Sequence, residues 1–122
     1  MKPLPKEYRG IVLLSRIGDT ALCLNIKNEG NWFAGYEVHQ VTIAPAVTIK
    51  GVFYPERERY ASSSEFGIRA WAYPNMTTVF KHHPEFAEKL PEILENLGNT
   101  QFNACNKAKV FDELYVLQNA HK

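Results

Sequence analysis

The chain is poor in cysteine and lacks long apolar runs, and both absences limit where it is expected to work. Its 122 residues include two cysteines, Cys23 and Cys105, and no apolar run is longer than the four residues IVLL at 11–14. A membrane-spanning helix needs about 20 apolar residues, so we expect no membrane partner. The amino-terminal stretch MKPLPKEYRG has no apolar core of the kind that secretion signals carry. We therefore expect a cytoplasmic protein whose two thiols are free, because a reducing compartment does not favour disulfides.

The charge is nearly balanced, with 14 basic and 13 acidic side chains and a formal net charge of +1. Proteins that coat duplex nucleic acid carry a clear basic excess or stripe, so duplex nucleic acid is not an expected partner. A small phosphate-bearing ligand needs only a few local cations and is compatible with this balance. The length and the hydrophobic content of 45% predict one globular domain over residues 1–122.

Sequence motifs for catalysis and metal binding are also lacking. The chain has neither a glycine-rich nucleotide loop nor a G-x-S-x-G nucleophile motif. Two of the four histidines are adjacent, which does not suit a shared metal ion, and no Cys, Asp or Glu stands at ligand spacing around any of them. The carboxylate pairs, Glu56 with Glu58 and Asp112 with Glu113, lack the apolar setting that acid–base chemistry needs. We expect a protein that is not an enzyme and that holds neither a metal nor a cofactor.

The first sixty residues carry a strand pattern. Residues 8–17 are rich in β-branched and large apolar side chains, and residues 21–27 are apolar at alternate positions. With the turn signal GDT between them, these segments predict a hairpin. A third strand is expected over 35–44, where the alternation changes phase near His39 and predicts a bulge or bend. A second hairpin is expected over 47–54, around a Lys-Gly turn.

Helical signals begin after this region. The S-x-x-E spacing at 62–65 is that of a capping box and predicts a short helix over 65–72. A second short helix is expected over 76–83, and a longer one over 84–97. Pro91 should kink or split the longer helix, because proline removes a backbone donor and clashes with the preceding turn.

The last segment, residues 108–120, suits either a helix or a strand. Val110, Leu114 and Leu117 have helical spacing, whereas LYVL at 114–117 is typical of a strand, and we favour the strand. Strands therefore precede helices along most of the chain. This segregation predicts an α+β fold, with an amino-terminal antiparallel sheet and carboxy-terminal helices packed on it.

The stretch YPERERY at 54–60 is the main candidate for a binding element. In an extended chain its two arginines, Arg57 and Arg59, share one face and lie about 7 Å apart. Guanidinium groups bind phosphate oxygens with two hydrogen bonds each, and nearby aromatic residues can stack on a base. The alternative is a solvated edge strand, because alternating charges on an edge also discourage edge-to-edge pairing.

The strand-rich stretch YEVHQVTIAPAVTIKGVFYPERERYASSSEFGIRAWAY, followed by helices, resembles the first-described family of small phage Thoeris anti-defence proteins. The resemblance implies an oligomeric protein that binds cyclic ADP-ribose isomers at a subunit interface and holds them without cleavage. Arginines would bind the pyrophosphate, and an aromatic ring and an asparagine would bind the base and riboses. The corresponding residues are Arg57 with Arg59, Phe80 or Phe86, Asn96 or Asn103, and Lys107 or Lys109. Lysine at the last position departs from the family pattern, in which arginine would fit better.

The expected function is therefore sequestration of a small phosphate-bearing nucleotide signal. The resemblance implies a cyclic ADP-ribose isomer or a cyclic oligonucleotide, bound in the host cell cytoplasm so that bacterial anti-phage immunity is blocked. The alternative is a small phage or plasmid protein-interaction module that inhibits a host protein through an edge strand or through the aromatic stretch at 66–73.

Overall fold

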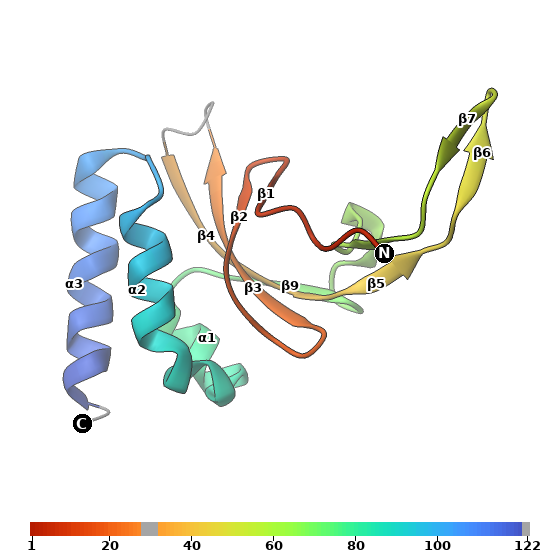
Figure 1. Ribbon diagram of the computed structural model, residues 1–122. Coiled ribbons are helices and arrows are strands. Elements are labelled where there is room, and N and C mark those ends of the chain that lie inside the picture. The colour runs from red at the N-terminus through yellow and green to blue at the C-terminus, as the bar shows by residue number, and fades with distance from the viewer. Residues whose placement is uncertain (28–31, 121–122) are drawn as a thin grey trace.

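A five-stranded antiparallel sheet lies at the centre of the protein (Figure 1). The computed structural model describes residues 1–27 and 32–120. The sheet has the strand order β1-β2-β3-β4-β9. Its strands are β1 (Glu7–Tyr8), β2 (Ile11–Ile17), β3 (Thr20–Lys27), β4 (Trp32–Gln40) and β9 (Ala70–Tyr73). The predicted hairpin of the first two long strands is confirmed, with Ile17 paired to Thr20 across its turn.

Helices cover one face of this sheet (Figure 1). The described α-helices are α1 (Met76–His82), α2 (Leu90–Gly98) and α3 (Ala104–Ala120), and the 3₁₀ helices are η1 (Ser63–Glu65) and η2 (Pro84–Lys89). The predicted α+β fold, with an amino-terminal antiparallel sheet and carboxy-terminal helices packed on it, is confirmed. None of the described helices is long and apolar enough to cross a membrane.

The two faces of the sheet differ in what they bury. Along β3, Leu22 and Leu24 point toward the helices and join the main core, which also contains Tyr36 and Val38 of β4. Burial of one such large side chain contributes about 1.5–3 kcal/mol. The intervening residues point the other way, as strand geometry requires, and Cys23 belongs to a smaller cluster on that face. The second face is therefore only partly filled by apolar side chains.

The chain leaves the sheet near the predicted phase change. β4 ends at Gln40, and the next strand, β5 (Thr42–Ala44), pairs instead with β8 (Arg57–Arg59). Val41 lies between these strands and donates its N–H to the Asp19 carbonyl at 2.7 Å. The change in alternation therefore marks a transfer of the chain from one sheet to another rather than a bulge within one strand.

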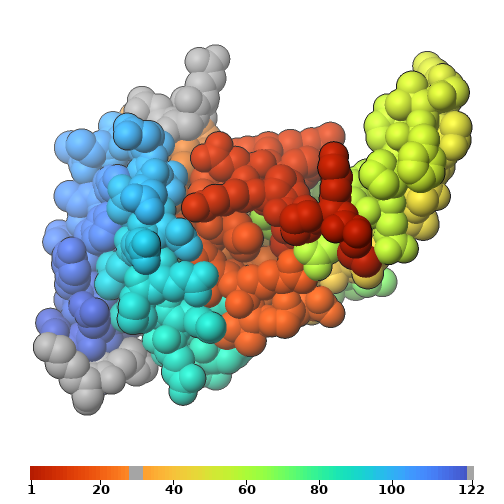
Figure 2. All heavy atoms as spheres, viewed as in Figure 1, coloured from red at the N-terminus to blue at the C-terminus, as the bar shows by residue number. Residues whose placement is uncertain are grey.

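A hairpin projects from the body beyond β5 (Figures 1 and 2). It is formed by β6 (Val47–Ile49) and β7 (Val52–Tyr54), and we call residues 45–56 the arm. Lys50 and Gly51 have φ angles of 52° and 77°, which is the left-handed region that a two-residue hairpin turn requires. The predicted hairpin over 47–54 is confirmed.

Two predictions about secondary structure were wrong. The capping box at 62–65 forms, but it begins only the single turn η1, and residues 70–73 pair with β4 as strand β9. Gly67 has a φ of 89°, which ends the helical geometry. The last segment is helix α3 rather than a strand, because the helical spacing buries Val110 and Leu114 against the other helices.

The remaining helical predictions hold. Helix α1 begins after Asn75, whose side chain accepts a hydrogen bond from the Thr78 N–H. The predicted helix over 84–97 is split, with η2 beginning at Pro84 and α2 beginning at Leu90. Pro91 lies in the first turn of α2, where its missing N–H costs no helical hydrogen bond.

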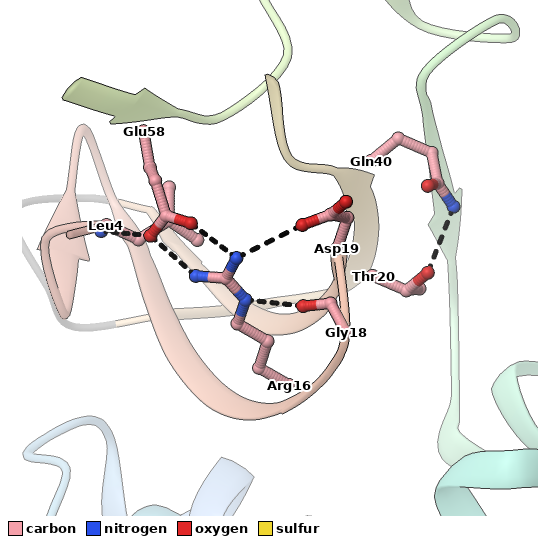
Figure 3. A network of polar contacts seen from close by, with 7 residues as sticks. All are labelled: Leu4, Arg16, Gly18, Asp19, Thr20, Gln40 and Glu58. Carbon is pink, nitrogen blue, oxygen red and sulfur yellow. Dashed lines mark hydrogen bonds and ion pairs between the residues drawn. The ribbon is translucent and has the colours of Figure 1, made fainter. Parts of the chain in front are cut away.

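An ion-pair network joins the amino-terminal segment, β2 and β8 (Figure 3). The guanidinium of Arg16 donates to both carboxylate oxygens of Glu58, at 2.7 and 2.5 Å, and the Leu4 N–H donates to the same carboxylate at 3.1 Å. Backbone hydrogen bonds from Lys2 to the Glu56 carbonyl and from Glu58 to the Lys2 carbonyl add to this attachment. The amino-terminal segment therefore runs beside β8 and is held over the second face of the sheet.

Candidate ligand-binding pocket

A pocket of about 960 Å³ lies on the second face of the sheet, opposite the helices. Its floor is formed by side chains of β2, β3 and β4, namely Ile11, Asn25, Glu37 and His39. Its walls are formed by the amino-terminal segment, with Lys2 to Pro5, Tyr8 and Arg9, and by the adjacent segment from Arg57 to Ser63 with Phe66. Pockets of this size suit small-molecule ligands.

The floor of the pocket holds a closed polar network. Glu37 accepts a hydrogen bond from the Asn25 amide at 2.6 Å and contacts Nε2 of His39 at 2.8 Å. The other ring nitrogen of His39, Nδ1, accepts the Ala61 N–H at 3.1 Å. Because Nδ1 accepts, the hydrogen-bond network assigns the ring proton to Nε2, which donates it to Glu37. Both ring nitrogens of His39, which is 1% exposed, are therefore occupied within the protein.

The lining of the pocket is mainly cationic. Its lining includes five basic residues, Lys2, Arg9, Lys27, Arg57 and Arg59, and two acidic residues, Glu37 and Glu58. Glu58 is already paired with Arg16, whose hydrogen bonds hold the pKa of the Glu58 carboxyl below its usual value. The local excess of positive charge arises although the whole chain is nearly neutral.

The two predicted arginines have different surroundings. The Arg59 guanidinium donates to Glu65 at 2.9 Å and to the Tyr60 carbonyl at 3.3 Å. The Ser62 N–H and then Arg59 hold the pKa of Glu65 at about 2, so this ion pair persists over the physiological pH range. Arg57 is exposed and has no side-chain hydrogen bond or ion pair with any residue that the structure describes. Arg57 is thus the arginine of the pair whose guanidinium is available to a ligand.

Aromatic rings lie beside these cations. Tyr8 and Tyr60 stack with ring centroids 5.8 Å apart, and the Tyr60 hydroxyl donates to the Pro5 carbonyl at 2.6 Å. The guanidinium of Arg9 lies 5.2 Å from the centre of the Tyr8 ring. Phe66 lies nearly perpendicular to the His39 ring, with centroids 5.7 Å apart, yet remains 38% exposed. The pocket therefore offers ring surfaces that can stack on a planar group.

The other residues named from the resemblance lie in the helical layer, on the opposite face of the sheet. Phe80 and Phe86 are buried in the main core. The Asn96 amide donates to the Leu14 carbonyl at 2.7 Å and fastens α2 to β2. Neither Phe80 nor Phe86 is open to a ligand within one chain, because the helices and the sheet enclose both rings.

The last three of these residues lie at or near the beginning of α3. The Asn103 side chain accepts hydrogen bonds from the N–H groups of Cys105 and Asn106 and so caps the helix. Lys107 donates to the carbonyls of Gly98 and Thr100 at 3.1 and 2.8 Å, and Lys109 is exposed. Within one chain the structure does not bring Arg57 and Arg59 together with any of the other six residues.

Several pocket residues were missed from the sequence. Glu37 and His39 share the parity opposite to the buried Tyr36 and Val38, so the alternation of β4 places them on the second face. That signal was present in the sequence. The contribution of Lys2 and the rest of the amino-terminal segment has no local signal, because it depends on contacts more than fifty residues away in the chain.

Comparison with known proteins gives no matching family model, no matching curated protein and no matching solved structure. Within the described residues, no group of three or more His, Cys, Asp or Glu side chains is arranged to hold a metal ion. His121 lies outside those residues. The chemistry of the pocket is therefore argued from its own geometry.

Proposed function

We propose that this protein is a non-catalytic binding protein that sequesters a small phosphate-bearing nucleotide in the pocket on the second face of its sheet. One observation carries the proposal: five basic residues and partly exposed aromatic rings line one pocket, and Arg57 among them makes no side-chain hydrogen bond or ion pair with any residue that the structure describes. Charge-assisted hydrogen bonds from a guanidinium to phosphate are among the strongest that a protein makes. Stacking adds about 1–3 kcal/mol per base.

Binding without turnover is supported by the state of His39. A general base needs a free lone pair within reach of the ligand, and the Nδ1 lone pair of His39 is occupied by the Ala61 N–H. Its Nε2 faces Glu37. The histidine thus holds residue 61 against the sheet and is not oriented toward a substrate. If the resemblance to the Thoeris anti-defence proteins holds, the bound nucleotide would be a cyclic ADP-ribose isomer or a cyclic oligonucleotide signal.

We also propose that the protein assembles with a second copy through the arm. The cross-strand pairs Val47–Tyr54 and Ile49–Val52 place four apolar side chains on one face of the hairpin, because paired residues share a face. All four are exposed. An isolated two-stranded hairpin is marginally stable in water, so a covering partner would stabilise it. The arm leads directly into Arg57, and a second copy packed on it would lie beside the pocket rim.

The same arm supports a second candidate function, a protein-interaction module that inhibits a host protein. In that case the apolar face of the arm would bind the host protein, and Arg57 would be a surface charge. The two candidates differ in a simple observable, which is whether a small nucleotide stabilises the purified protein.

The deciding experiment is thermal unfolding with a panel of pyrophosphate, nucleoside diphosphates, cyclic dinucleotides and cyclic ADP-ribose isomers. A ligand at 100 times its dissociation constant adds about 2.7 kcal/mol to the free energy of unfolding, which raises the melting temperature by several degrees. The shift should disappear in Arg57→Ala and persist in Lys81→Ala, which removes an exposed charge on α1. Mass spectrometry should recover the ligand intact.

Three results would count against the proposal. A shift that is unchanged in Arg57→Ala would place binding elsewhere. Recovery of cleaved ligand would make the protein an enzyme. The absence of any shift across the panel, together with a monomeric protein in solution, would favour the protein-interaction module.

A further inference from the structure

Glu37 stands out among the pocket residues because its carboxylate is buried without a full positive charge beside it. It is 9% exposed, and its contacts are the Asn25 amide and the His39 ring. Among the described residues it forms no ion pair with a lysine or arginine. A buried carboxylate is costly unless hydrogen-bond donors surround it, and two neutral donors leave part of its capacity unused.

The hydrogen-bond inventory of Glu37 defines that unused capacity. A carboxylate has about four acceptor positions, two on each oxygen. The Asn25 amide occupies one position on Oε2, and the His39 Nε2–H occupies one on Oε1. With the described residues alone, one position on each oxygen remains, and Glu37 lines the pocket. The remaining positions therefore match a ligand that presents two neighbouring donors.

The distribution of charge orients such a ligand. Four of the five lining cations, Lys2, Arg9, Arg57 and Arg59, belong to the walls and Lys27 is the last residue of β3, whereas Glu37 belongs to the floor. A phosphate group is attracted to the walls and repelled by the floor carboxylate. A ligand that binds both the cationic walls and the floor carboxylate must carry its anionic group at one end and its hydrogen-bond donors at the other.

We propose that Glu37 determines specificity for ribonucleotides by accepting hydrogen bonds from the two vicinal hydroxyls of a ribose. This inference rests on the proposed nucleotide-binding function and names the part of the ligand that the floor recognises. In dinucleotide-binding folds an acidic side chain accepts a hydrogen bond from the ribose 2′-hydroxyl. Asn25 and His39 act as positioning residues, since they fix both oxygens of the carboxylate before the ligand arrives.

The test compares ligands as well as protein variants, so that it does not depend on one substitution. Isothermal titration of the wild-type protein should show ADP binding at least about tenfold more tightly than 2′,3′-dideoxy-ADP, since a lost hydrogen bond to a charged group weakens binding by about this factor or more. Pyrophosphate is the third probe, because it reports on the cationic walls without a ribose. In Glu37→Gln the preference for ADP should fall to about one, while pyrophosphate binding is retained.

The outcomes separate this inference from the proposed function. Pyrophosphate binding that requires Arg57, together with equal affinities for ADP and its dideoxy analogue, would overturn the role of Glu37 and leave the anion site intact. If neither probe binds, both proposals fail. Should Glu37→Gln fold poorly, Asn25→Ala is the second variant. It keeps the carboxylate but releases one oxygen, and it should reduce the ADP preference severalfold without altering pyrophosphate binding. An unchanged preference in Asn25→Ala would contradict the positioning role.

Discussion

The ion pair between Arg16 and Glu58 provides a direct test of how the pocket wall is attached. In the wild-type protein the Arg16 guanidinium donates two charge-assisted hydrogen bonds to the Glu58 carboxylate. Replacing Glu58 by glutamine keeps the shape of the side chain but places a neutral amide group against the guanidinium. Such bonds contribute about 1.5–3 kcal/mol when buried, and partly exposed pairs contribute less because water screens them. Both side chains are partly exposed. We therefore expect Glu58→Gln to lower the free energy of unfolding by about 1–2 kcal/mol at pH 7.

The effect should depend on pH in a direction that the structure fixes. The pKa of Glu58 is lowered in the folded protein by its hydrogen bonds to Arg16. Its contribution to stability is therefore complete above the unfolded-state pKa and is lost as the pH falls through the folded-state pKa. The difference between wild type and Glu58→Gln should be constant from about pH 5.5 to 8 and shrink below about pH 4.5, near the usual carboxyl pKa.

Urea unfolding followed by circular dichroism at several pH values measures this difference. Glu56→Gln is the matched control, since its side chain is exposed two residues away in the chain and makes no side-chain contact that the structure describes. It should change the free energy of unfolding by less than about 0.5 kcal/mol. A Glu58→Gln variant as stable as wild type at pH 7 would refute the reasoning. So would a difference that persists undiminished at pH 3.

Two further variants test the remaining assignments. Phe86→Ala should lower the free energy of unfolding by about 3–5 kcal/mol, as loss of a fully buried aromatic ring does, and urea unfolding that shows a loss below 1 kcal/mol would contradict its place in the core. The double variant Ile49→Thr with Val52→Thr keeps strand-forming residues but removes apolar surface from the arm. If the proposed assembly through the arm holds, light scattering should show an oligomer for the wild type and a monomer for the double variant. Phe53→Thr, on the other face of the arm, is the control, and an equal mass for wild type and double variant would exclude assembly through this face.

Local patterns were sufficient to predict the three long strands of the sheet and most of the helices. Three examples are the apolar alternation at 22, 24 and 26, the Lys-Gly turn at 50–51 and the proline at 91. Each of these signals determines the backbone conformation of only the few residues around it. The two errors arose where local signals conflicted with tertiary contacts. Residues 70–73 form a strand because the edge of β4 is available to them. Residues 108–120 form a helix because α1 and α2 provide an apolar surface at helical spacing.

The candidate site shows the same limit more clearly. The alternation in YPERERY identifies Arg57 and Arg59 as neighbours on one face, and both line the pocket. The alternation does not indicate that Glu65 pairs with Arg59 while Arg57 has no charged partner among the described residues. That difference depends on the turn at 60–65, which brings a carboxylate back toward the strand. Sequence spacing thus located the cations but not which of them is available to a ligand.

The division of the sheet into two unlike faces explains how one small domain can combine a stable core with an open site. The helices bury the face that carries Leu22 and Leu24, and this packing holds the strands in register. The opposite face is free to present Glu37 and His39, because the core does not depend on apolar side chains at those positions. The amino-terminal segment and the β8 wall then close over it through polar contacts and through the smaller apolar cluster, to which Leu4, Cys23 and Tyr60 belong. A site built in this way can change its ligand by substitution in the walls while the helical layer continues to maintain the fold.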